Sequence, residues 1–156
     1  MADTPRSVSV HSDSIPDDVA TTSDGRHGVK ALCRRAGRVL LIEEVRADRS
    51  TFWTLPGGGV SPGESPTVGL QRELAEELNC VISCGDPVGT CTYDHTCLGD
   101  ITTVYTVFDC TLESEPSANR EEGVRRHAWV EPTARPDGLL DPFAALLDTL
   151  VDDGGG

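Results

Sequence analysis

Three glutamates, Glu73, Glu76 and Glu77, fall at positions i, i+3 and i+4 of one segment of the chain. On an α-helix this spacing places all three carboxylates on one face, where like charges repel one another. A hard cation such as Mg²⁺ relieves the repulsion, because it prefers oxygen ligands and shares them with the phosphates of a substrate. The spacing is therefore suited to metal-assisted chemistry on a phosphate compound, although the three glutamates alone fit a solvated acidic helix face better, and the residues around them decide between the two.

The residues around these glutamates predict the helix that would position them. Ser65 suits an N-cap and Pro66 the first helical position, so a helix is expected over residues 65–78. Asn79 tolerates the left-handed conformation that ends many helices. A separate apolar stripe is expected to face the core and consists of Leu70, Leu74 and Leu78.

Glycines occur both before the expected helix and within it. The run Leu55-Pro56-Gly57-Gly58-Gly59 breaks regular structure, and its glycines permit a close approach of backbone to a ligand. Gly69 lies one turn before Glu73 on the same face. There it leaves either open space beside the carboxylates or room for close helix packing.

The segment Gly58–Cys80 resembles the Nudix box, whose pattern is G-x5-E-x7-R-E-U-x-E-E-x-G-U with U a bulky apolar residue. Its opening glycine and all its charged positions are present, as Gly58, Glu64, Arg72, Glu73, Glu76 and Glu77. Asn79 stands where the family has glycine, and Cys80 occupies the last apolar position. Neither departure removes a charged group. The strands expected around the box extend the resemblance over roughly Gly28–Val151.

The resemblance implies a metal-dependent pyrophosphohydrolase, which cleaves a nucleoside diphosphate linked to another moiety by attack of water on phosphorus. Glu73, Glu76 and Glu77 would be the ligands of Mg²⁺ or Mn²⁺. The carbonyl oxygen of Gly57 or Gly58 would supply a further ligand.

The general base implied by the resemblance is either Glu73 or a glutamate in a later loop. Of the two loop candidates, Glu121 and Glu122, we choose Glu122, and a solvated loop is the alternative for both. Arg72 is expected to pair with Glu64 and to orient the loop against the helix rather than to touch substrate. Such a pair can be bidentate and geometrically strict.

Substrate recognition leaves several residues open. Arg46 and Arg49 are candidates for phosphate contacts, with a solvated loop as the alternative. Candidate contacts to a base, each equally consistent with a core position, are Phe52, Trp53, Tyr93, His95 and Tyr105. The substrate class stays open between sugar-nucleotide diphosphates such as ADP-ribose and (deoxy)nucleoside triphosphates, including oxidised ones.

Two other functions compete with this interpretation. One is an isomerase acting on a diphosphate lipid precursor, and the other is a catalytically weak module that binds nucleotide as a regulator. The complete set of box glutamates and the box arginine argues against both. No DNA-binding motif or basic strip accompanies the box, which argues against a transcription factor.

The charge balance restricts the partners of this chain. Its 156 residues suit one domain, and 26 acidic against 13 basic residues give a net charge of −13. Lys30 is the only lysine, a composition similar to that of salt-adapted intracellular proteins. Such a surface is not expected to bind nucleic acid or an anionic membrane. We expect a small-molecule nucleotide as partner and leave a homodimer open.

Composition also predicts the domain limits and the location. Residues 1–26 are rich in Ser, Thr, Asp and Pro and predict a disordered acidic tail, followed by the Nudix domain over 27–153. No apolar leader or membrane-spanning run occurs, so a cytoplasmic location is expected. Six cysteines include no C-x-x-C pair, and the spacing of Cys91, His95 and Cys97 fits no common zinc unit. Free buried thiols are therefore expected.

The remaining pattern predicts strands on both sides of the box helix. They are expected over Val29–Arg35, Arg38–Val45, Val81–Cys84, Val88–Tyr93, Ile101–Leu112 and Arg126–Val130. Turns are expected at Gly85–Pro87 and Leu98–Asp100, a polar loop at Glu113–Gly123, and a final helix from Asp141. Periodicity alone gives an α/β or α+β fold. The resemblance implies a Nudix-type α/β/α sandwich with a mixed β-sheet between helices.

Overall fold

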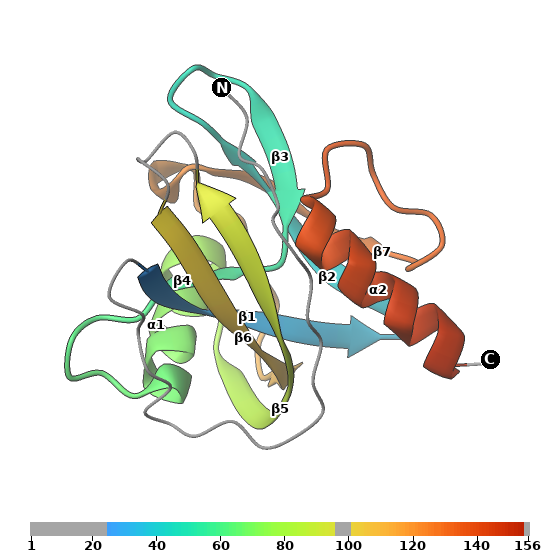
Figure 1. Ribbon diagram of the computed structural model, residues 1–156, viewed down its shortest axis with the longest axis horizontal. Helices are drawn as coiled ribbons and strands as arrows, with labels where there is room; N and C mark the ends of the chain where they lie inside the picture. The colour runs from blue at the N-terminus through green and yellow to red at the C-terminus, as the bar shows by residue number, and fades with distance from the viewer. Residues whose placement is uncertain (1–24, 96–100, 155–156) are drawn as a thin grey trace.

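A computed structural model describes residues 25–95 and 101–154 (Figure 1). Their elements are β1 (Gly25–Arg35), β2 (Arg38–Val45), β3 (Thr51–Thr54), β4 (Gly57–Gly59), α1 (Pro66–Leu78), β5 (Ile82–His95), β6 (Ile101–Leu112), the short 3₁₀ helix η2 (Arg120–Glu122), β7 (Val124–Val130) and α2 (Asp141–Gly154). The predicted hairpin connection at Leu98–Asp100 lies outside the described residues.

The strands form one mixed sheet between the two helices. Its order is β3-β2-β1-β6-β5, with β4 paired to β1 and β7 paired to β2. Strands β1 and β6 run parallel, and the other pairs are antiparallel. One apolar cluster contains the α1 residues Leu70, Leu74 and Leu78, and a second contains the α2 residues Phe143, Leu146 and Leu147. The two helices lie on different sides of the strands (Figure 1), which confirms the α/β/α sandwich.

The region predicted as two strands, Val81–Cys84 and Val88–Tyr93, forms the single long strand β5, so the predicted turn between them is wrong. The pairing of β5 with β6 shifts register around Pro87, which marks bulges. A Cβ added to Gly85 would lie 2.8 Å from the carbonyl oxygen of Asp109, so the two backbones stay close there. A bulge accommodates extra residues and a proline that lacks an N–H donor. The turn-like sequence therefore does not end the strand.

Smaller differences concern the ends of elements. Strand β1 begins at Gly25, inside the tail predicted over 1–26, and the rest of that tail lies outside the described residues. The glycine run predicted only as a breaker contains the short strand β4, in which Gly57 pairs with Lys30 of β1. The loop predicted over 113–123 contains η2.

The expectation of free buried thiols holds for four of the described cysteines, whereas Cys84 is free but only half-buried. Five cysteines are free thiols, namely Cys33, Cys80, Cys84, Cys91 and Cys110. Cys97 lies outside the described residues, so the zinc hypothesis stays untested. None of the helices in the described part of the chain has the length and apolarity needed to cross a bilayer.

Candidate active site

Helix α1 has the ends that the sequence predicts. The Ser65 hydroxyl accepts a hydrogen bond from the Val68 N–H at 3.3 Å, and Pro66 occupies the first turn. Asn79 adopts a left-handed conformation with φ of 52°, and its N–H donates to the Ala75 carbonyl. The three leucines of the apolar stripe are fully buried. Their burial fixes the rotation of the helix and turns the glutamate face toward β4.

Arg72 links this face to the loop before it. Its Nε and Nη2 atoms donate to the two carboxylate oxygens of Glu64 over 2.8 and 3.0 Å. Its Nη1 atom donates to Glu73 at 3.0 Å and to Glu76 at 3.1 Å. Nη2 also donates to the Gly59 carbonyl at 3.1 Å. The expected pair with Glu64 is therefore present and bidentate, and the same guanidinium joins two carboxylates of the glutamate face.

Glu64 has a further structural role beside Gly69. It accepts a hydrogen bond from the Ser61 N–H at 2.9 Å, and the hydrogen bond from Arg72 lowers its pKa to about 2. A Cβ added to Gly69 would lie 3.1 Å from the Glu64 Oε1 atom. The space beside Gly69 is thus filled by Glu64, which is neither the open space nor the helix packing considered from the sequence.

Substituting Arg72→Lys is expected to lower kcat/KM roughly 10- to 100-fold, because one ammonium group cannot donate to all the oxygens that the planar guanidinium of Arg72 contacts. The fall should be measured as kcat/KM, with a thermal melt to follow stability. Arg125→Lys, on the exposed side of β7, is the matched control and should behave as wild type. An Arg72→Lys enzyme with unchanged kcat/KM would contradict an orienting role.

Two carboxylates lie directly against the glycine backbone. Glu77 is only 8 % exposed, and its Oε1 atom accepts a hydrogen bond from the Gly57 N–H at 2.9 Å. A Cβ added to Gly58 would lie 2.6 Å from the Glu73 Oε1 atom, so a side chain at this position would displace the Glu73 carboxylate. The Glu76 side chain is 42 % exposed and reaches the group through Arg72. The fold therefore places Glu77 against Gly57 and Glu73 against Gly58, and Arg72 links Glu76 to Glu73.

The negative charges of Glu73 and Glu77 are buried and only partly compensated by the neighbouring cations Arg72 and Lys30. Burial raises the pKa of Glu73, and the hydrogen bond and charge of Arg72 oppose that rise. Burial raises the pKa of Glu77 well above its ordinary value, and the charge of Lys30 opposes it. Additional positive charge at this position would favour both ionised forms.

These oxygen donors fit a hard divalent cation in chemical type. Within the described residues, no three acidic, histidine or cysteine side chains gather closely enough to hold a metal ion as they stand. Glu73 and Glu76 instead bond Arg72, and Glu77 bonds the Gly57 N–H. The incompletely compensated negative charge of Glu73 and Glu77 and the oxygen donors together support cation binding. A bound cation would replace some of the hydrogen bonds to Arg72 and to the Gly57 N–H.

Lys30 is a site residue that the sequence analysis did not single out. It is 4 % exposed, and its Nζ atom donates to the carbonyl oxygens of Leu55 at 3.0 Å and Gly57 at 3.1 Å. Nζ also lies 5.0 Å from the ring centroid of Tyr105 and 5.6 Å from that of Phe143. The available signal was a lone lysine inside the otherwise apolar stretch Val29–Cys33 of β1.

A cavity of about 270 Å³ adjoins the glutamate face. Its lining includes Glu77, Gly57 and Gly58 of the glutamate face and its loop, together with Lys30, Glu44, Phe52, Thr54, Tyr93, Tyr105 and Phe143. Burial raises the pKa of Glu44, which the charge of Lys30 opposes. The Thr54 hydroxyl is the buried side-chain oxygen without a hydrogen-bond partner in the described part of the chain. The cavity therefore offers aromatic rings together with polar groups that a ligand could satisfy.

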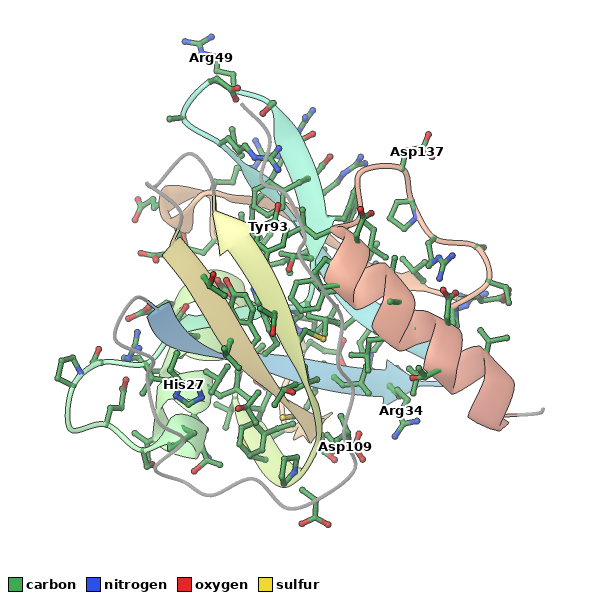
Figure 2. The ribbon with its side chains drawn as sticks, in the orientation of Figure 1. His27, Arg34, Arg49, Tyr93, Asp109 and Asp137 are labelled. Atoms are coloured by element: carbon green, nitrogen blue, oxygen red, sulfur yellow. The ribbon has the colours of Figure 1, made fainter. Side chains whose placement is uncertain are left out.

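The four residues proposed for substrate contacts lie in different surroundings. Tyr93 is buried and lines the cavity, whereas Trp53 belongs to the core under α2. The Arg46 guanidinium stacks 4.4 Å from the centroid of the Phe52 ring. Arg49 is exposed at the outer end of the loop between β2 and β3 and points away from the molecule (Figure 2). Neither arginine lines the cavity.

The loop that carries Glu121 and Glu122 is anchored to the end of α1. Asn119 donates from its side chain to the Glu76 carbonyl at 2.8 Å and from its backbone to the Glu77 carbonyl at 2.9 Å. Both loop glutamates are exposed. The anchoring holds η2 beside the helix that bears the glutamate face.

Comparison with known proteins adds an independent finding. A family model described as NUDIX domain matches residues 26–150. The nucleoside triphosphatase NudI of Escherichia coli O1:K1 / APEC is 36 % identical over 107 residues, covering 59 % of this chain and 72 % of that protein.

Solved structures agree in fold. The MutT NUDIX hydrolase of Burkholderia pseudomallei matches with a TM-score of 0.66 and 28 % identity, over 80 % of this chain and 96 % of that one. The MutT protein of Methanosarcina mazei Go1 matches with a TM-score of 0.73 and 23 % identity, over 88 % and 100 %.

Proposed function

Because this chain belongs to the Nudix hydrolase family, whose enzymes act on phosphoanhydride bonds, we propose that it is a metal-dependent pyrophosphohydrolase of (deoxy)nucleoside triphosphates. Enzymes of this family act on small nucleotide substrates and generally use divalent metal ions. The choice of triphosphates rests on the similarity to a nucleoside triphosphatase. ADP-ribose-like and oxidised substrates stay open, and so does the choice between Mg²⁺ and Mn²⁺.

One observation carries this proposal: the arginine-bound glutamate face lies beside a cavity that contains aromatic rings and a buried lysine. Glu73, Glu76 and Glu77, with a carbonyl of Gly57 or Gly58, would hold the metal. The rings of the cavity offer stacking surfaces for a base. The substrate phosphates would then extend toward the glutamate face.

In the mechanism we propose, a divalent metal held by Glu73, Glu76 and Glu77 would supply positive charge to neutralise phosphate oxygens and to ease deprotonation of a water. Glu73 is one candidate for the general base, because its carboxylate lies on the glutamate face directly against Gly58. Glu122 is the second candidate for the base, and it is held near α1 through the Asn119 contacts. Arg72 and Glu64 hold the loop and the helix in a fixed relation.

Metal binding is expected to stabilise the protein more at pH 8 than near pH 5. Glu73 and Glu77 have folded-state pKa values raised above 4.5, so their contribution to stability grows as pH falls through those values. A bound metal offsets the free-energy cost of burying these two carboxylates in their ionised form. Protons compete with the metal for the carboxylates, so metal binding weakens as pH falls. Melting temperatures in Mg²⁺ and in chelator across this range check the expectation. A metal-induced shift that is equal at both pH values would contradict it.

A substrate panel tests the proposed function. The purified protein in high salt with Mg²⁺ or Mn²⁺ would be offered the standard nucleotides, 8-oxo-dGTP, ADP-ribose, NADH and dinucleoside polyphosphates, with products separated by chromatography. Metal-dependent cleavage of triphosphates between phosphates is the expected result. Preference for ADP-ribose would correct the substrate class. No turnover by a folded, metal-binding protein would favour the regulatory module. The cytoplasmic location and salt adaptation remain predictions.

A further inference from the structure

Three cysteines lie in a row across three neighbouring strands. Cys33 of β1 pairs in register with Cys110 of β6, and Cys110 pairs in register with Cys84 of β5. Paired positions point to the same face of a sheet. The three thiols accordingly lie at the apolar cluster beneath α1, which also contains Cys80.

The position of Cys84 opposite Cys110 is suited to a disulfide. In the same ladder, the Glu113 N–H donates to the Val81 carbonyl at 2.7 Å, which marks a hydrogen-bonded pair. Hydrogen-bonded and non-hydrogen-bonded pairs alternate in an antiparallel ladder, so Cys84 and Cys110, three pairs along, form a non-hydrogen-bonded pair. The Cα atoms of such pairs lie about 4.5 Å apart, within the range that disulfides span.

The two thiols have different surroundings, which assigns them different roles. Cys84 is half-buried and its Sγ atom lies 3.8 Å from the Thr67 carbonyl in the first turn of α1. A hydrogen bond from Cys110 lowers the pKa of Cys84, and the same contact raises that of Cys110, which is only 7 % exposed. Cys84 is thus the more exposed of the two thiols, and the contact between them favours ionisation of Cys84 over Cys110.

We propose that Cys84 and Cys110 form a dithiol site that small disulfides such as oxidised glutathione convert into an intramolecular disulfide. The Cys84 thiolate attacks one sulfur of the small disulfide, forming a mixed disulfide and releasing one thiolate. Cys110 then gives its proton to the first released thiolate and attacks the Cys84 sulfur, which releases the second thiolate to take up a proton from solvent. Two protein thiols are oxidised, and the small disulfide is reduced to two thiols.

Cys33 is the competing partner for Cys110, but it lacks access. It is 1 % exposed, and burial raises its pKa to about 12. Closing the link between β5 and β6 restrains the unfolded chain between them, so the oxidised protein should melt at a higher temperature. This inference does not depend on the proposed hydrolase activity.

The test is to incubate the folded full chain with oxidised glutathione, block free thiols and map peptides by mass spectrometry. The expected result is one disulfide joining Cys84 to Cys110, with a raised melting temperature that a reductant reverses. In Cys110→Ala, Cys84 should accumulate a stable glutathione adduct. Cys33→Ala is the matched control and should form the same disulfide as wild type.

Several results would overturn the proposal, and the wild-type protein alone can deliver them. A disulfide between Cys33 and Cys110, or glutathione left on Cys84 of the wild-type chain, would contradict the assigned pair. Thiols that stay reduced in the folded protein but oxidise in denaturant would show that the site is closed to small disulfides.

Discussion

Replacing Glu77 with glutamine is expected to lower kcat/KM roughly 100-fold or more, because a metal contributes several kcal/mol of transition-state stabilisation. The glutamine oxygen can still accept the hydrogen bond that Gly57 donates at 2.9 Å, so the loop should keep its position. Since the buried carboxylate has a raised pKa, its removal should not lower the stability of the metal-free protein at neutral pH. Loss of activity without loss of stability is the result expected for a residue that coordinates the catalytic metal.

Steady-state kinetics over a metal titration, together with denaturant unfolding, measures both quantities. Glu76→Gln should show a similar loss, whereas Glu113→Gln, an exposed glutamate beyond β6, is the matched control. Nearly unaltered turnover in either site variant would show that the metal ligands are assigned wrongly.

Replacing Lys30 with methionine is expected to lower the free energy of unfolding by about 2–4 kcal/mol at neutral pH, because two buried hydrogen bonds from a charged group are lost. Those bonds hold the carbonyls of Leu55 and Gly57, so the turn before the glutamate face loses its support. Lys30 also opposes the raised pKa values of Glu44 and Glu77. Without it, the ionised carboxylates are less compensated.

The pH dependence separates this electrostatic role from simple packing. Glu44 and Glu77 have raised pKa values, so they bind protons in the folded state as pH falls and their penalty disappears. The loss caused by Lys30→Met should therefore be smaller near pH 5 than at pH 8, as measured by urea unfolding. Lys30→Arg, which keeps the charge, serves as the comparison. A loss independent of pH would leave only a packing role.

The sequence by itself determined the elements whose cause is local. Ser65, Pro66 and Asn79 specify both ends of α1 through contacts with their near neighbours. The spacing of the glutamates places them on one face, since helical geometry follows from residue number alone. The pairing of Arg72 with Glu64 also lies within this local unit, one loop away. These features, and the family pattern that they form, could be predicted from the residues.

Elements whose outcome depends on a distant strand could not be predicted in the same way. Gly85, Asp86 and Pro87 have the composition of a turn, yet they continue β5 because β6 pairs on both sides of the irregularity. The stabilisation from pairing along the whole length of β6 exceeds the local preference of these residues for a turn. The sequence of β5 alone does not show which strand it will pair with.

Only the tertiary structure decided which side chains share the site. Lys30, Glu44 and Tyr93 come from three strands and meet at one cavity beside Glu77, while Arg46 and Arg49 remain outside it. The row of thiols likewise exists only because β1 and β5 both flank β6 in the observed register. Strand order and register are set by burial summed over the whole sheet, so the neighbours of a single residue cannot specify them.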